Sequence, residues 1–159
     1  GERAIVAVGG EYLILRTSWV YSDHGKNFLL TMQRLLQEKP HLRIVADQIG
    51  APTWADTIAL STRALLERWQ AGQAGDWGIY HLTAQGHTSW FGFAQVIGEH
   101  LRAQGKACAE LEAIPSSAYP TPAKRPLNSR LDCSRLQQQW HASQPQWQDA
   151  LRECLAGQH

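Results

Sequence analysis

Short apolar segments with strand character alternate with segments of helical period along most of the chain. Residues 12–21, YLILRTSWVY, are apolar, β-branched and aromatic without strict alternation, which is typical of a strand covered on both faces in the centre of a parallel sheet. The segments 42–47, 78–83 and 109–115 are the other predicted strands. Strands that alternate with helices favour an α/β fold.

Amphipathic helices are predicted between and after these strands, because apolar side chains recur there every three or four residues. The expected helices run from Phe28 to Pro40, from Thr53 to Gly72, from Thr88 to Gly105, around Leu136, and from Trp147 to Leu155. Thr53 and Asp56 have the spacing of a capping box, and either Thr88 or Ser89 is the expected cap of the third helix. The segment 48–53, QIGAPT, is predicted to be a loop because it contains glycine and proline.

Composition excludes several classes of protein. The 159 residues carry 15 Lys plus Arg against 14 Asp plus Glu, a net charge of +1, so we expect neither an acidic tail nor a nucleic-acid-binding surface. The wholly apolar runs are far shorter than the ~20 residues of a membrane helix. The chain has three cysteines at irregular spacing, Cys108, Cys133 and Cys154. We therefore expect neither a disulfide framework nor a zinc site, and we expect a cytoplasmic location.

The segment 116–130, SSAYPTPAKRPLNSR, contains three prolines and no regular period, so it is predicted to be a long functional loop. In and just after it, four basic residues against one acid give a local charge of +3: Lys124, Arg125, Arg130, Arg135 and Asp132. The arginine fork donates paired hydrogen bonds to phosphate oxygens, so the segment can bind a diphosphate. A solvated basic loop is the alternative interpretation.

Other constellations give weaker signals. Ser22, Asp23 and His24 are the residue types of a nucleophilic triad, but adjacent residues do not readily assemble the geometry of nucleophile, base and orienting group. His81 and His87 have no carboxylate or thiolate at ligand spacing, so metal binding is not expected there. The glycine-rich loops G-x-G-x-x-G and G-x-x-x-x-G-K, which cradle phosphates, are absent from the chain.

Tryptophan is frequent, with seven residues in the chain. Trp69, Trp90, Trp140 and Trp147 lie on apolar faces of predicted helices and are expected to anchor the core. Trp19 lies near the end of the first predicted strand, and ligands of parallel α/β proteins collect at the carboxyl ends of strands. Its position is equally compatible with contact to a sugar or base and with simple burial.

Four strings occur in order along the chain: RTSWVY at 16–21, DQIGAPT at 47–53, YHL at 80–82 and SAYPTPAKRPLNSRLD at 117–132. Together they resemble the C-terminal half of the dTDP-4-dehydrorhamnose reductases, a family of extended short-chain dehydrogenase/reductases. The resemblance implies an α/β fold, namely the C-terminal part of a Rossmann-like fold with the last parallel sheet strands and the small substrate-binding subdomain. Residues 1–159 would be the substrate-binding portion, and the N-terminal dinucleotide-binding half would be absent.

The resemblance also implies an activity for the full-length protein. It would use NADPH or NADH to reduce the 4-keto group of dTDP-6-deoxy-L-lyxo-4-hexulose to dTDP-L-rhamnose, a step in cell-surface polysaccharide and lipopolysaccharide biosynthesis. In the family a tyrosine donates the proton, with a lysine four residues later. No Tyr-x-x-x-Lys occurs here, and Gly1-Glu2 matches a pair that closely follows that motif. We therefore expect no catalytic residue in this chain, and no turnover by the fragment alone.

Site residues are carried over from the family at the matching positions. Trp19 corresponds to a tryptophan that contacts the deoxysugar. Gln48 and Thr53 lie in the DQ-x-G-x-PT string and are expected to line the substrate pocket, although Thr53 also has the position of a helix cap. Arg125 and Asn128, in RP-x-NS, are the expected contacts for the diphosphate or the thymidine.

The family implies further partners. Asp56 matches an acidic position that bridges a dimer through a metal, Mg²⁺, in some relatives, but the second position, near Gln148, is not acidic here. The expected partners are the dTDP-sugar, the missing N-terminal half and a second copy in a homodimer, with no nucleic acid and no membrane. A non-catalytic sugar-nucleotide-binding or regulatory module of the same fold is the alternative function.

Overall fold

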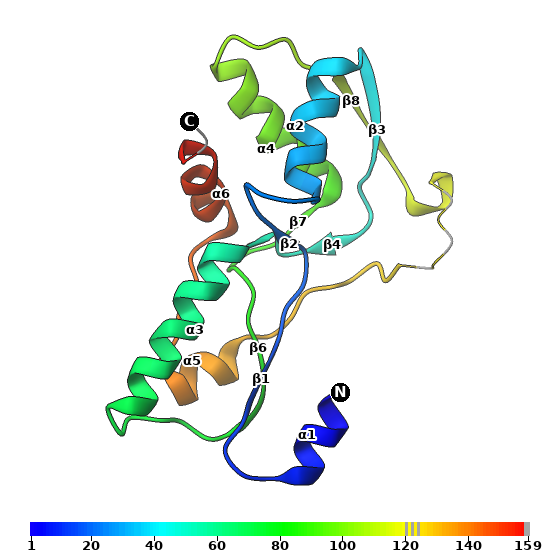
Figure 1. Cartoon of the computed structure of the whole chain (residues 1–159). Coiled ribbons are helices and arrows are strands. Elements are labelled where there is room, and N and C mark those ends of the chain that lie inside the picture. Colours follow the sequence, from blue (N-terminus) through cyan, green and yellow to red (C-terminus); the bar gives the residue numbers. More distant parts are fainter. Residues whose placement is uncertain (120, 122, 124, 158–159) are drawn as a thin grey trace.

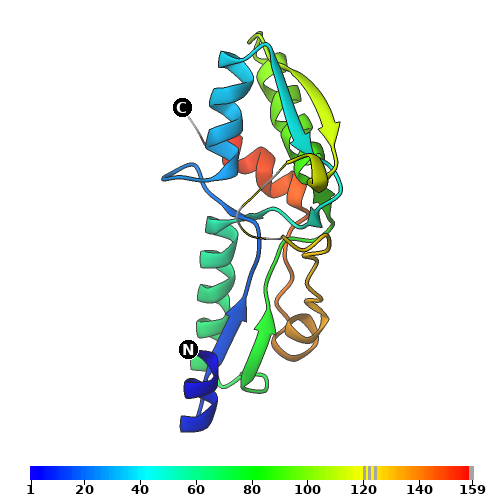
Figure 2. The same cartoon turned by 90° about the vertical axis from the view of Figure 1, so that its right-hand side faces the viewer.

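The structure is a computed structural model and describes residues 1–119, 121, 123 and 125–157. Helices and strands alternate along the chain. In space they lie in two groups that meet near the middle of the molecule (Figures 1 and 2). The elements are α1 (Glu2–Val8), β1 (Leu13–Arg16), β2 (Val20–Tyr21), α2 (Phe28–Glu38), β3 (His41–Val45), β4 (Ile49–Gly50), β5 (Thr53–Trp54), α3 (Ala55–Gln70), β6 (Gly78–His81), β7 (Thr88–Ser89), α4 (Trp90–Ala103), β8 (Glu110–Ile114), the 3-10 turn η1 (Ser116–Ala118), α5 (Ser134–Trp140) and α6 (Trp147–Ala156).

The strands form pairs. β1 with β6, β2 with β5, and β3 with β8 are parallel, whereas β4 with β7 is antiparallel. The parallel pairs join strands that are far apart in sequence, which requires crossover connections such as the helix α3 between β5 and β6. The chain therefore has the α/β architecture with parallel strands that the sequence predicted.

Each group of elements has its own apolar core. The larger core lies among α2, α4 and α6 and contains side chains that are at most 5% exposed, including Leu29, Leu36, Phe93, Ile97 and Leu151. The smaller core lies among α3, α5 and β6 and comprises Leu65, Tyr80, Leu82, Leu136 and Trp140. The two groups of elements meet around β2 and β4 (Figure 1).

Most predicted helices are confirmed, and their ends follow local chemistry. Asn27 caps α2 by accepting a hydrogen bond from the Leu30 amide, and Ser89 caps α4 by accepting one from the Gly92 amide. The predicted capping box of α3 is wrong. Its N-cap residue is Trp54, without a side-chain cap bond, because the Thr53 hydroxyl is used elsewhere.

The single strand predicted over 12–21 is also wrong. Trp19 has φ 51°, a left-handed conformation that L-residues seldom adopt, and it separates β1 from β2. Leu82 N donates to Arg16 O, and Thr53 N donates to Trp19 O, so the two halves of the segment pair with different partners. Within the described residues β1 pairs only with β6.

Three smaller differences concern an unpredicted helix, a predicted loop and an exposed tryptophan. Helix α1 was not predicted, because its apolar residues follow one another without a helical period, and Val8 is 87% exposed. The predicted loop at 48–53 contains β4 and the first residue of β5. Trp69, predicted to anchor the core, is 45% exposed.

In the described part of the chain, no helix has both the length and the apolar character needed to cross a membrane.

Candidate substrate site

A hollow of about 500 Å³ lies at the junction of the two groups of elements. Its walls come from the end of the broken first strand, from the segment before β4, from the start of α4 and from the late proline-rich loop. The lining residues are Trp19, Gln48, Trp90, Arg125, Pro126 and Ser129. The structure thus brings three of the five predicted site residues, Trp19, Gln48 and Arg125, to one hollow.

Backbone pairing explains why these distant segments meet. Ile49 N donates to Leu127 O, and Ser129 N donates to Ile49 O, both at 2.8 Å. Ser18 Oγ donates to Ser129 O at 3.4 Å on the other side. The proline-rich loop is therefore held between β4 and the residues just before Trp19, which brings Arg125 and Trp19 to the same hollow.

Trp19 is positioned by its backbone and by a second indole. Its ring is stacked on that of Trp90, with 3.6 Å between centroids and 8° between planes. The positive φ of a bulky residue costs of order 1–3 kcal/mol and persists only where the surroundings over-determine it. Such an outlier at the wall of a hollow makes Trp19 a candidate functional residue.

Gln48 is held at both ends of its side-chain amide. Its Oε1 accepts a hydrogen bond from Trp90 Nε1 at 3.2 Å, and its Nε2 donates to Ser116 Oγ at 2.9 Å. The amide nitrogen has a second hydrogen. Gln48 therefore has one donor left for a bound molecule in the hollow.

Arg125 is the positive charge of the site. It is exposed, and it has no carboxylate partner among the residues that the structure describes. Arg125, Gln48 and Trp90 also line a second hollow of about 360 Å³, whose other walls include Phe28, Met32, Arg43, Ile44 and Tyr119. Arg43 lies 3.7 Å from Glu112, so the guanidinium of Arg125 is the one left for an anion where the hollows adjoin.

Two predicted site residues lie elsewhere. Thr53 is fully buried, and its Oγ1 donates to Ala51 O and accepts from Ala84 N, so its hydroxyl is used inside the protein. Asn128 lines neither hollow. Its Oδ1 accepts hydrogen bonds from the amide and Nε of Arg130, and its backbone pairs with Ile49.

The basic residues of the loop do not act as one patch. Arg130 is bonded to Asn128, and Arg135 donates to Ile79 O with its guanidinium 4.5 Å from the centroid of the Tyr80 ring. Lys124 lies outside the described residues. Of the three described arginines, only Arg125 lines the Trp19 hollow.

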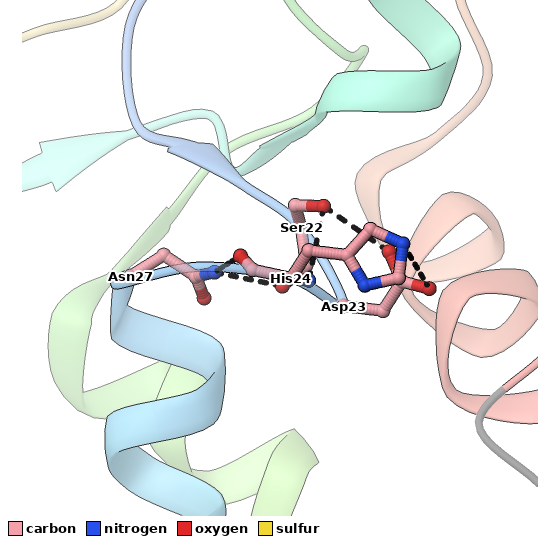
Figure 3. Close-up of polar contacts among 4 residues, drawn as sticks. All are labelled: Ser22, Asp23, His24 and Asn27. Carbon is pink, nitrogen blue, oxygen red and sulfur yellow. Dashed lines mark hydrogen bonds and ion pairs between the residues drawn. The ribbon is translucent and has the colours of Figure 1, made fainter.

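Ser22, Asp23 and His24 lie in the loop between β2 and α2 (Figure 3). Ser22 Oγ donates to Asp23 Oδ1, and His24 Nε2 lies 3.6 Å from Asp23 Oδ2. The His24 ring makes no bond to the Ser22 hydroxyl, which accepts only the His24 backbone amide. Because a base must contact the nucleophile it activates, the arrangement is not a triad. Asn27 Nδ2 closes the loop by donating to Ser22 O and His24 O.

Metal ligands do not gather in the described residues, where no group of three His, Cys, Asp or Glu could hold an ion. His81 Nδ1 lies 3.0 Å from Asp132 O, in a hydrogen bond to the backbone. A third cavity, of about 530 Å³, lies beside Thr83, Cys133 and Gln144. Gln144 is already bonded to Ser61 there, and Cys133 accepts from Thr83 N.

Sequence reasoning missed Trp90, Pro126 and Ser129 as walls of the hollow. Trp90 was expected in the core because it follows the apolar period of its helix, and that period does not distinguish a core side chain from one that lines a cavity. Ser129 adjoins Asn128 in the same string. A loop has no period from which to infer which of the two side chains faces inward.

Comparisons with known proteins identify the family of the chain. The family model described as the RmlD substrate binding domain matches residues 1–159. The dTDP-4-dehydrorhamnose reductase of Burkholderia thailandensis is 44% identical, over 98% of this chain and 54% of the relative, and that of Escherichia coli K12 is 41% identical, over 98% and 52%. The chain spans about half the length of these relatives.

A solved structure shows the same fold. The dTDP-4-dehydrorhamnose reductase of Bacillus anthracis, in complex with NADP, superposes with a TM-score of 0.84 at 28% identity, over 98% of this chain and 52% of that one. The fold is therefore that of part of a Rossmann-like reductase.

Proposed function

The chain belongs to the RmlD substrate binding domain family, and from this premise we propose that residues 1–159 hold the dTDP-sugar substrate of a dTDP-4-dehydrorhamnose reductase. The reaction is the reduction of the 4-keto group of dTDP-6-deoxy-L-lyxo-4-hexulose to dTDP-L-rhamnose, with NADPH or NADH as the hydride donor. One observation carries the proposal: Trp19, Gln48 and Arg125, from three distant segments, line one hollow.

Each side chain has a distinct task in this proposal. The Trp19 indole offers an apolar surface to the deoxyhexose and its methyl group. Arg125 donates forked hydrogen bonds to the diphosphate, and Gln48 donates its remaining amide hydrogen to a sugar hydroxyl or a phosphate oxygen. The second hollow, walled by Phe28, Tyr119 and other apolar side chains, takes the thymidine.

Hydride transfer itself is assigned to the part of the relatives that this chain does not cover. The chain contains neither a G-x-G-x-x-G string nor a Tyr-x-x-x-Lys pair, so its own residues do not fit the phosphates of a dinucleotide or the family's proton donor. Its contribution is to orient the keto-sugar. The Mg²⁺ that bridges a dimer in some relatives is not part of this proposal, because the second acidic position, near Gln148, is missing from this chain.

Calorimetric titration of the chain with dTDP-L-rhamnose, the proposed product, tests substrate binding. Binding should be saturable, weaker for dTDP alone and weaker still for free L-rhamnose, because each shorter ligand loses the contacts of one hollow. Equal heats for dTDP-L-rhamnose and buffer would refute the proposal. A regulatory module would also bind, so the upstream coding sequence separates the two functions: a glycine-rich dinucleotide loop followed by Tyr-x-x-x-Lys supports the reductase.

A further inference from the structure

Four side chains form a continuous chain of hydrogen bonds that starts outside the hollow and ends on its wall. Ser116 Oγ donates to Asp47 Oδ1 at 2.5 Å, and the Ser116 amide lies 2.9 and 3.0 Å from the two Asp47 carboxylate oxygens. Gln48 Nε2 donates to Ser116 Oγ, and Trp90 Nε1 donates to Gln48 Oε1. The chain thus connects η1, the segment before β4 and the start of α4.

The direction of these bonds is fixed by the two groups at the ends. An indole N–H can only donate, and an ionised carboxylate can only accept. The Ser116 hydroxyl and amide also lower the pKa of Asp47, which keeps it ionised. Each middle group must therefore accept from one neighbour and donate to the other, and only one orientation of the Gln48 amide satisfies all the bonds.

Rotating that amide by half a turn would break the chain at two points. Gln48 Nε2 would then face the N–H of Trp90, donor against donor. Gln48 Oε1 would face the Ser116 oxygen, whose hydrogen is engaged by Asp47. Charge-assisted bonds of the Asp47 kind are the stronger ones, so Ser116 keeps its orientation and Gln48 follows.

The orientation of the Gln48 amide affects the proposed ligand site through Trp90. Gln48 and Trp90 line both hollows, whereas Asp47 and Ser116 line neither. The Trp90 ring is the surface on which Trp19 is stacked. A residue that acts here without touching the hollow must act by positioning other side chains.

We propose that Ser116, anchored by Asp47, is a positioning residue for the sugar-nucleotide site: it fixes the Gln48 amide in the one orientation that holds the Trp90 ring against Trp19. The proposal deepens the proposed function and rests on it for the identity of the ligand. The positioning itself is a property of the unliganded chain and is measurable without any ligand.

The direct test removes the Ser116 hydroxyl. In Ser116→Ala, Gln48 Nε2 loses its acceptor, the amide is free to rotate, and Trp90 loses a fixed acceptor. Near-ultraviolet circular dichroism reports on indoles in a fixed asymmetric environment, and the difference between the unmodified chain and Trp19→Phe defines the signal of the stacked pair. Ser116→Ala should lose most of this signal. Ser117→Ala, a neighbour exposed in the same turn, should keep it.

Binding provides the second readout. Ser116→Ala should weaken binding of dTDP-L-rhamnose about fivefold, the effect of losing one hydrogen bond, and Ser116→Thr, which retains the hydroxyl, should restore it. Ser116→Ala with an unchanged indole signal and an unchanged affinity would overturn the proposal.

Two further outcomes are also decisive. If Ser116→Ala does not unfold cooperatively, Asp47→Ala replaces it as the test, because without the carboxylate the Ser116 hydroxyl can donate to Gln48 and the chain of hydrogen bonds can reverse. An intact signal of the stacked pair in Asp47→Ala would then overturn the proposal. If the unmodified chain does not bind dTDP-L-rhamnose, the proposed function fails, while the indole signal of Ser116→Ala still decides whether Ser116 positions Trp90.

Discussion

A β-carbon on Gly50 would lie 2.4 Å from Cε2 of the Trp19 indole, and 2.7 and 2.8 Å from Nε1 and Cδ2. These distances are shorter than any contact that two carbon or nitrogen atoms tolerate, so the indole occupies the space of a missing side chain. Trp90 confines the same ring by stacking. The small residue in β4 and the stacked ring together determine where Trp19 lies.

Gly50→Ala should therefore displace Trp19. We expect the free energy of unfolding to fall by about 1–3 kcal/mol, as for other overpacked sites, and dTDP-L-rhamnose to bind more weakly. Chemical denaturation and calorimetry measure the two effects. Gly98→Ala is the matched control, because its β-carbon would meet only the Arg102 guanidinium, at 3.5 Å, and alanine favours the interior of α4. An alanine at 50 that leaves both quantities unchanged would contradict the steric argument.

Trp19→Ala should affect the sugar more than the nucleotide. The indole lies at the hollow assigned to the deoxyhexose. Its loss should weaken the binding of dTDP-L-rhamnose about tenfold, which corresponds to the loss of an aromatic contact of about 1.4 kcal/mol, and should leave the affinity for dTDP nearly unchanged. Titration with both ligands measures the ratio. Trp69→Ala, an exposed indole on α3, is the control. Equal losses for both ligands would mean that Trp19 has only a structural role.

Arg125→Ala should weaken the binding of dTDP-L-rhamnose and of dTDP by similar factors, because both ligands contain the diphosphate. A charged hydrogen bond contributes about 1.5–3 kcal/mol, so the loss should exceed tenfold, and raising the salt concentration should weaken binding less in the variant. Arg3→Ala, on the exposed face of α1, is the control. An affinity for dTDP that does not change in Arg125→Ala would remove the guanidinium from the site.

The sequence predicts elements well where burial and local period coincide. Helices α2 and α4 were predicted because Leu36 and Ile97 follow the period of a buried face, and both are fully buried. Helix α1 was missed because its apolar residues, Ala4 to Val8, follow one another without a helical period. The break at Trp19 depends on pairing with Thr53, a contact between residues 34 positions apart that local propensity does not encode.

For the site, the resemblance located the strings but not the directions of their side chains. Trp19, Gln48 and Arg125 come together because Ile49 pairs with the loop at 127–129. Asn128 belongs to the same string, yet its side chain turns to Arg130. Whether a loop residue faces inward depends on its backbone pairing, which only the three-dimensional structure supplies.

The last prediction concerns Cys154, which lies in α6 and is 1% exposed. Burial, together with the charges of Asp23 and Asp56, raises the pKa of its thiol from 9.0 to about 12. The folded chain therefore holds this proton more tightly than the unfolded chain. Its contribution to stability is complete below pH 9 and is lost progressively as the pH rises from there toward 12.

Cys154→Ala should remove the part of the loss of stability at alkaline pH that comes from this thiol. Between pH 9 and 11 the free energy of unfolding of the unmodified chain should fall more steeply than that of the variant, by as much as about 1.4 kcal/mol per pH unit. Denaturant titrations at each pH measure the difference, and Cys108→Ala, whose thiol is partly exposed, is the control. Parallel slopes for the unmodified chain and Cys154→Ala would show that the thiol titrates alike in both states, and burial would then not govern its proton.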